Sequence, residues 1–232
     1  MSPDKAFILA AGFGKRLRPL TNTIPKPLVK VGGIPMIDQA LEKLNALGVQ
    51  SCVINTHYKA EALQKHLQSH AQPQIIISHE AELLDTGGGI KNGLSHFDAP
   101  FFILSGDSVW EDAPNENTLK ALAESWSSEK MDILMLLQPV SSMRLTQGVG
   151  DYDVDEDGRA TRSLDKTGSH MFTSIRINAP HIFDDSPDGA FNYRDLMDAA
   201  QEKGRLYGIV HRGDWHHIST PEDLNAVNEA LE

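Results

Sequence analysis

Short apolar runs alternate with segments of helical spacing along the chain, and this alternation restricts the fold more than any other feature. Residues 7–11 form a continuous apolar run that ends at Gly12, which is typical of a strand buried on both faces. Residues 35–47 repeat apolar positions at helical spacing up to Gly48, and residues 49–55 are apolar again. Strands that alternate with helices predict crossover connections and a parallel sheet covered by helices on both faces.

The alternation continues towards the C-terminus. We expect strands at residues 75–77, 100–107, 132–137 and 206–211, and helices at 60–70, 117–126, 192–203 and 221–231. Thr220 is the expected cap of the last helix, because it stands before a proline at the first helical position. Residues 148–177 instead consist of short pieces separated by turns such as Asp157-Gly158, which indicates antiparallel strands.

These elements predict an α/β protein. We expect a three-layer α/β/α, Rossmann-like fold, with a mixed, mostly parallel sheet and a small antiparallel lobe. No linker divides the sequence. We therefore predict a single domain over residues 1–232, with a main part at about 1–110 and an inserted lobe at about 140–195.

Charge is unevenly distributed along the chain. The 232 residues include 21 basic and 32 acidic side chains, and the net charge of −11 argues against a protein that coats nucleic acid or anionic membrane. The segment from Lys5 to Ile37 nevertheless holds six basic residues and no acidic one. This segment is either a solvated face or the binding site of a small anion.

The single cysteine and the N-terminus exclude other classes. Cys52 lies in an apolar run and permits neither an intrachain disulfide nor a cysteine-based metal cage. The apolar run near the start is too short for a membrane span and lacks the layout of a secretory signal. We expect a cytoplasmic protein with neither nucleic acid nor membrane as a partner.

The loop after the first strand is rich in glycine and cations. Gly12, Gly14, Lys15 and Arg16 follow a buried strand, where open parallel sheets place ligands and where backbone N–H groups can approach a phosphate. The spacing is not that of a Walker loop. It is not the dinucleotide fingerprint either, because Leu17 stands at the third glycine position.

The longer pattern is more specific. The run LAAGFGKRLRPLT at residues 9–21, with PKPL at 25–28, resembles the signature of the sugar-1-phosphate nucleotidyltransferases, which make nucleoside-diphosphate sugars. The resemblance implies that Arg16 stabilises the reacting phosphates and that Lys26 contacts phosphate. It also implies that the loop wraps the triphosphate with Ala10, Ala11, Gly12, Gly14 and Lys15.

A second segment resembles the part of this family that reads the nucleobase. Glu80 precedes the run DTGGGI at residues 85–90. An ionised Glu80 would accept a ring N–H, as uracil, thymine and guanine all offer, while Asp85, Gly87 and Gly88 would form a base-binding turn. The alternative is that the glycines allow close packing at the start of a helix.

The family's metal motifs are only partly present. Asp107 at the end of the fourth expected strand resembles the aspartate that holds Mg²⁺. In the closing motif His217 replaces the second aspartate ligand, and imidazole suits zinc better than magnesium. His66 and His70 are one helical turn apart, but no zincin glutamate or third partner accompanies them in the sequence.

The sugar-phosphate half of the site is less clearly marked. Resemblance gives Asp165 to the sugar hydroxyls, Lys166 to the sugar phosphate and Thr173 to the same subsite. An ordinary surface Asp-Lys pair is the alternative. The family has glycine where Ser174 stands.

The reaction that the resemblance implies joins a nucleoside triphosphate to a sugar 1-phosphate and releases pyrophosphate. The short chain and its motifs are most similar to the uridylyltransferases that use UTP and N-acetylmuramic acid 1-phosphate in bacterial cell-wall recycling. The alternatives are a mannose-1-phosphate guanylyltransferase, another sugar-phosphate or phosphocholine nucleotidyltransferase, and a nucleotide-binding protein without turnover. The sequence gives no indication of oligomeric state.

Overall fold

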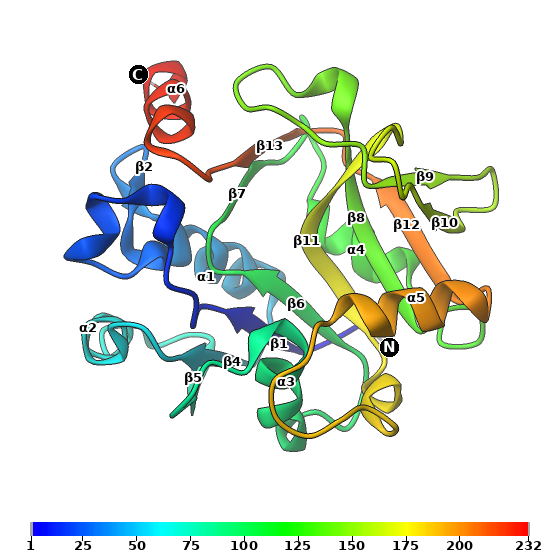
Figure 1. The fold of residues 1–232 in the computed structure, drawn as a ribbon, viewed down its shortest axis with the longest axis horizontal. Coiled ribbons are helices and arrows are strands. Elements are labelled where there is room, and N and C mark those ends of the chain that lie inside the picture. Colours follow the sequence, from blue (N-terminus) through cyan, green and yellow to red (C-terminus); the bar gives the residue numbers. More distant parts are fainter. Residues whose placement is uncertain (1, 232) are drawn as a thin grey trace.

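A nine-stranded sheet forms the centre of the molecule (Figure 1). The structure is a computed structural model and describes residues 2–231. Four strands stand side by side in the first half: β5 (Gln74–His79), β4 (Ser51–Thr56), β1 (Lys5–Leu9) and β6 (Phe101–Ser105). Five complete the second half: β11 (His170–Asn178), β8 (Ile133–Pro139), β12 (Leu206–Val210), β9 (Tyr152–Val154) and β10 (Ala160–Arg162).

The strand directions confirm the predicted mixed sheet. β1 is parallel to both β4 and β6, β4 is parallel to β5, and β12 is parallel to β8. β11 is antiparallel to β6 and β8, and β9 and β10 pair antiparallel with each other. The antiparallel strands lie within the segment where short pieces and turns predict them.

Helices cover both faces of the sheet. β6 shows why: Phe102 and Leu104 join the core on one face, while Phe101 and Ile103 join the core on the other. The first face is covered by α1 (Met36–Leu47), α2 (Ala60–Leu67) and α4 (Thr118–Ser125). The opposite face is covered by α3 (Asp85–Asn92) and α5 (Arg194–Glu202) (Figure 1). The predicted three-layer α/β/α fold is therefore confirmed.

A smaller apolar core stands beside the main sheet. It joins α6 (Pro221–Leu231) to β2 (Lys30–Val31) and β7 (Ser108–Glu111) through Val31, Val109 and Val227. β7 pairs with β13 (Asp214–His217), and β2 pairs with β3 (Ile34–Pro35). These four strands are absent from the prediction, because segments of two to four residues carry too little periodicity to be recognised.

The predicted cap of α6 is present. Thr220 Oγ1 accepts a hydrogen bond from the Asp223 N–H at 3.2 Å, and Asp223 Oδ2 accepts one from the Thr220 N–H at 2.8 Å. Among residues 2–231, no helix combines the length and the apolar character that crossing a membrane requires.

Candidate active site

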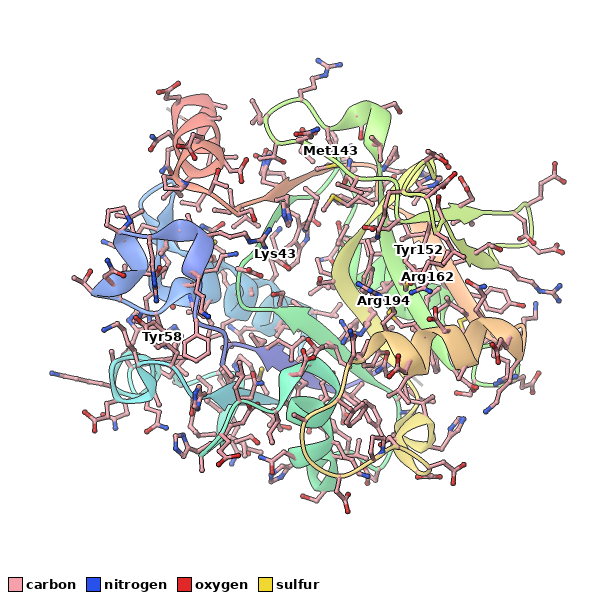
Figure 2. All side chains as sticks on the ribbon, in the orientation of Figure 1. Lys43, Tyr58, Met143, Tyr152, Arg162 and Arg194 are labelled. Atoms are coloured by element: carbon pink, nitrogen blue, oxygen red, sulfur yellow. The ribbon has the colours of Figure 1, made fainter. Side chains whose placement is uncertain are left out.

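A cavity of about 620 Å³ opens beyond the carboxyl end of β1 and extends to β9, β10 and the start of α5. Such an edge of an open α/β sheet is where ligands bind. Figure 2 shows Tyr152, Arg162 and Arg194 gathered on the lobe side of this space. Its wall combines the loop after β1 with residues that lie more than 140 positions later in the chain.

Positive charge dominates the wall of the cavity. Three of its lining residues are acidic: Asp85, Asp107 and Asp151. Seven are basic: Lys15, Arg16, Lys26, Arg162, Lys166, Arg176 and Arg194. In a chain with a net charge of −11, this local excess of cations indicates anionic ligands.

The loop after β1 occupies one side of the cavity. All six residues predicted to meet the triphosphate line it, namely Ala10, Ala11, Gly12, Gly14, Lys15 and Arg16. Among residues 2–231, no carboxylate lies within 4.0 Å of the Lys15 or Arg16 nitrogens. Both side chains are exposed, so both are free to pair with phosphate.

Lys26 and Asp107 meet across 81 residues of sequence at the floor of the cavity. The Lys26 ammonium donates to Asp107 Oδ2, and the Ser105 hydroxyl donates to Oδ1. Burial raises the pKa of the Asp107 carboxyl, but the Lys26 charge and these two hydrogen bonds outweigh burial, and the pKa is lower than usual. Asp107 is therefore ionised at neutral pH and positioned to meet a cation.

His217 lies close to Asp107, although it does not line the cavity. The β13–β7 register pairs His217 with Ser108, the residue after Asp107. Burial lowers the pKa of His217, and the Lys26 and Arg16 charges lower it further. A neutral imidazole is a nitrogen donor and a poor ligand for magnesium. The chemistry at this position fits a divalent cation held by Asp107 and phosphate oxygens.

Glu80 is buried beside the cavity wall, and its predicted contact with a base stays a prediction. Its Oε1 accepts from Asn55 Nδ2 at 2.7 Å, and its Oε2 accepts from the Leu84 N–H at 2.9 Å. Asn55 Oδ1 in turn accepts from the Ala10 N–H at 2.6 Å. Glu80 thus orients Asn55. Asn55 lines the cavity and holds the start of the loop after β1. The sequence motif identifies Glu80 but does not reveal these two hydrogen bonds.

Gly87 and Gly88 are not among the residues that line the cavity, and their predicted role at the base stays a prediction. They belong to α3, and the Gly87 N–H donates to the Phe191 carbonyl at 3.0 Å. A Cβ on Gly88 would stand 2.1 Å from the Gly189 carbonyl oxygen. The glycines therefore allow the segment before α5 to pack on α3, which is the alternative stated above, while Asp85 does line the cavity.

The predicted sugar-phosphate residues separate into one that lines the cavity and two that do not. Lys166 lines it and pairs with Asp151 at 2.6 Å. Asp165 instead ties its own loop together, since its Oδ1 accepts from the Ser163 and Thr167 hydroxyls at 2.8 Å. Thr173 is fully buried and donates to the Leu136 carbonyl at 2.8 Å. The substrate contacts of Asp165 and Thr173 stay predictions, and the structure shows only their contacts within the protein.

Backbone strain concentrates at the cavity. Asp85, Lys166 and Ser174 have φ of 56°, 65° and 66°, and all three line the wall. Such values favour glycine, and non-glycine residues with them cluster at functional sites. Ser174 lies in the irregularity where β11 changes register against β8, between Phe172 and Arg176. This conformation explains why the resembling family has glycine at that position.

Three arginines of the cavity are missing from the sequence prediction. Arg162 comes from β10 and pairs with Asp198 at 3.1 Å, whereas Arg194 begins α5 and has no carboxylate within 4.0 Å in the described chain. Arg176 is 1% exposed and lies 4.0 Å from the Tyr193 ring centroid. No local motif marks these residues, because only the packing of the lobe brings them together.

A family model described as nucleotidyl transferase matches residues 5–232, which include every part of this cavity. The chain belongs to the nucleotidyl transferase family. This nucleotidyltransferase is 34% identical to the N-acetylmuramate alpha-1-phosphate uridylyltransferase of Caulobacter vibrioides, over 99% of this chain and 98% of the relative.

One further relative and one solved structure are also similar to this chain. The mannose-1-phosphate guanylyltransferase catalytic subunit beta of Danio rerio is 31% identical over 95% of this chain, and the match spans 62% of that relative. A Bacillus anthracis crystal structure described as a putative glucose-1-phosphate thymidylyltransferase superimposes with a TM-score of 0.82 and 18% identity, over 98% of this chain and 94% of the other. The last likeness is one of fold alone. The nucleotidyltransferase fold and enzyme class are therefore established.

Proposed function

We propose that this nucleotidyltransferase transfers a uridylyl group from UTP to N-acetylmuramic acid 1-phosphate, giving UDP-N-acetylmuramic acid and pyrophosphate. The observation that carries the proposal is the second group of cations in the cavity. Arg162, Lys166, Arg176 and Arg194 line the lobe side; Arg162 pairs with Asp198 and Lys166 with Asp151, whereas Arg176 and Arg194 have no carboxylate within 4.0 Å among residues 2–231. A sugar phosphate with one more anionic group matches this excess, and the lactyl carboxylate of N-acetylmuramic acid is such a group.

The two sides of the cavity divide the substrates between them. We assign the triphosphate to the part at about residues 1–110, through the loop at residues 10–16, and the sugar phosphate to the lobe at about 140–195 together with Arg194. Within the lobe, Lys166 suits the 1-phosphate as a movable point charge. Arg194 suits a planar carboxylate, because its guanidinium offers paired donors and lacks an acidic partner within the described residues.

The reaction needs positioning and charge neutralisation rather than a protein nucleophile. A phosphate oxygen of the sugar 1-phosphate attacks the α-phosphorus in line, a new P–O bond forms, and the bond to the β-phosphate oxygen breaks as pyrophosphate leaves. Arg16 neutralises charge on the reacting phosphates, and Lys26 holds phosphate beside Asp107. Mg²⁺, held by Asp107, would supply Lewis-acid stabilisation of the phosphate oxygens.

Pyrophosphate release with a panel of substrates tests this proposal. The panel pairs UTP or GTP with N-acetylmuramic acid 1-phosphate or mannose 1-phosphate, with and without Mg²⁺. We expect turnover with UTP and N-acetylmuramic acid 1-phosphate. The product, UDP-N-acetylmuramic acid, would belong to bacterial cell-wall recycling. Turnover confined to GTP and mannose 1-phosphate would instead support the activity of the Danio rerio relative.

The replacement of a metal-binding aspartate by His217 favours a second candidate, a nucleotide-binding protein without turnover. The same panel separates the two functions when triphosphate binding is measured by calorimetry in parallel. Binding of UTP with no pyrophosphate release from any pair would support the second candidate and contradict the first.

A further inference from the structure

A cluster of two histidines and one aspartate lies outside the cavity, on the helices that cover the first face of the sheet. His66 is in the last turn of α2, and His70 follows that helix. Their Nε2 atoms lie 2.7 Å and 3.2 Å from the same oxygen, Oδ1 of Asp38 in the first turn of α1. The structure thus provides the third partner that the sequence did not show, since Asp38 is 28 residues away from His66.

We propose that Asp38, His66 and His70 form a binding site for a divalent transition metal of the zinc class. The three donor atoms all lie within 4.8 Å of one another, close enough to share one ion after small side-chain adjustments. Two imidazole nitrogens and one carboxylate oxygen are a common protein ligand set for Zn²⁺ and leave its fourth position for water. The set does not suit Mg²⁺, which prefers oxygen ligands.

α1 and α2 hold Asp38 and His66 in place before any metal binds, and the His70 N–H directly after α2 donates to the Leu67 carbonyl at 3.1 Å. Ile37 and Leu41 of α1 and Leu63 and Leu67 of α2 are at most 3% exposed and belong to the same core. Each of the three ligands keeps about a fifth to a third of its side chain exposed. A metal can therefore reach ligands whose backbones are fixed, which reduces the ordering cost of binding.

The hydrogen bonds of the metal-free cluster use the same three atoms that would bind the metal. Without metal, each Nε2 must carry a proton to donate to Asp38. One carboxylate oxygen then receives two donors, and the rings stand 5.4 Å apart between centroids. When a divalent ion binds, each neutral imidazole would carry its proton on Nδ1 instead of Nε2, the Nε2 lone pair would face the metal, and Asp38 would offset part of the ionic charge.

The cluster is independent of the catalytic cavity. None of its three residues lines that cavity. The metal would link the start of α1 to the end of α2, so we expect it to stabilise the fold without taking part in nucleotidyl transfer.

Zinc titration of the purified, tag-free protein after chelator treatment tests the site. Competition against a chromophoric chelator should show one tight equivalent of Zn²⁺. His66→Gln, His70→Gln and Asp38→Asn should each weaken its affinity at least about tenfold, because each removes a ligand. Zn²⁺ should raise the thermal midpoint of the wild type and not that of the variants. Co²⁺ should give the visible absorption of a four-coordinate centre.

His181→Gln is the matched control, because His181 pairs with Asp132 at 3.1 Å without a second histidine. It should leave Zn²⁺ affinity unchanged. Mg²⁺-dependent turnover should be the same in all four variants, which shows that they are folded. Zn²⁺ binding that is absent from the wild type, or that is equally strong in the three ligand variants, would overturn the proposal.

Discussion

At the scale of single residues, the cavity separates cations that are free from cations that are paired within the protein. Arg16 and Arg194 have no acidic partner in the described chain, whereas Lys26 and Lys166 each hold an aspartate. Free cations are available to bind substrate directly. Each paired lysine must divide its hydrogen bonds between its aspartate and an incoming phosphate. These two lysines therefore hold an aspartate in position as well as bind substrate.

Arg16→Ala is expected to lower kcat/KM at least about a hundredfold, because it removes a cationic donor from the reacting phosphates. The exposed side chain makes no ion pair among residues 2–231, so the urea midpoint should not change. Steady-state kinetics and urea unfolding check both points. Arg18→Ala is the control, since Arg18 is exposed and does not line the cavity. Equal kcat/KM in the two variants would remove Arg16 from the mechanism.

The sequence motifs identified residues that the structure brings together at one cavity. The cavity is lined by these predicted residues: Ala10, Ala11, Gly12, Gly14, Lys15, Arg16, Lys26 and Asp107. The sequence did not reveal contacts that depend on how a neighbouring element packs. Glu80 accepts a hydrogen bond from Asn55, and Thr173 donates one to the Leu136 carbonyl. Neither contact can be recognised in the sequence.

At the scale of elements, the irregularity in β11 turns this strand past the cavity. Ser174 has φ of 66° there, which costs an L-residue about 1 kcal/mol. Ser174→Gly should therefore raise the free energy of unfolding by about 0.5–1 kcal/mol, measured by urea unfolding. Ser127→Gly is the control, because Ser127 does not have a positive φ and glycine should destabilise there. A loss of stability in Ser174→Gly would contradict the assigned strain.

The connection between β12 and β13 gives a pH dependence. His211 is 4% exposed there, and burial lowers the pKa of its imidazole. The unfolded chain therefore takes up a proton at a higher pH than the folded protein does. Its free energy of unfolding should fall as pH decreases below about 6.5, the value for an unburied histidine, and level off below the folded pKa.

Urea unfolding of the wild type and of His211→Gln, between about pH 7.5 and about pH 5.5, checks this dependence. The variant should lose less stability over that range than the wild type, because it cannot take up the proton. Parallel curves for the two proteins would show that His211 does not contribute. Other buried groups affect both proteins alike, so the difference isolates His211.

At the scale of the whole molecule, alternating strands and helices were enough to predict the layers but not the cavity. Apolar periodicity determines which faces are buried, and the main strands and helices lie close to the predicted segments. The cavity instead depends on how β9, β10 and α5 pack against the loop after β1, and that packing joins segments far apart in the sequence. A chain of net charge −11 thereby presents a cavity with seven basic and three acidic residues.

The central claim is that this cavity recognises a sugar phosphate with a second anionic group. The most direct test compares kcat/KM with UTP for N-acetylmuramic acid 1-phosphate and N-acetylglucosamine 1-phosphate, which differ only in the lactyl ether. We predict a preference of at least about tenfold for the former, since a charge-assisted contact is worth about 1.5–3 kcal/mol and tenfold corresponds to about 1.4 kcal/mol. Equal values, or a preference for the uncharged sugar, would contradict the account.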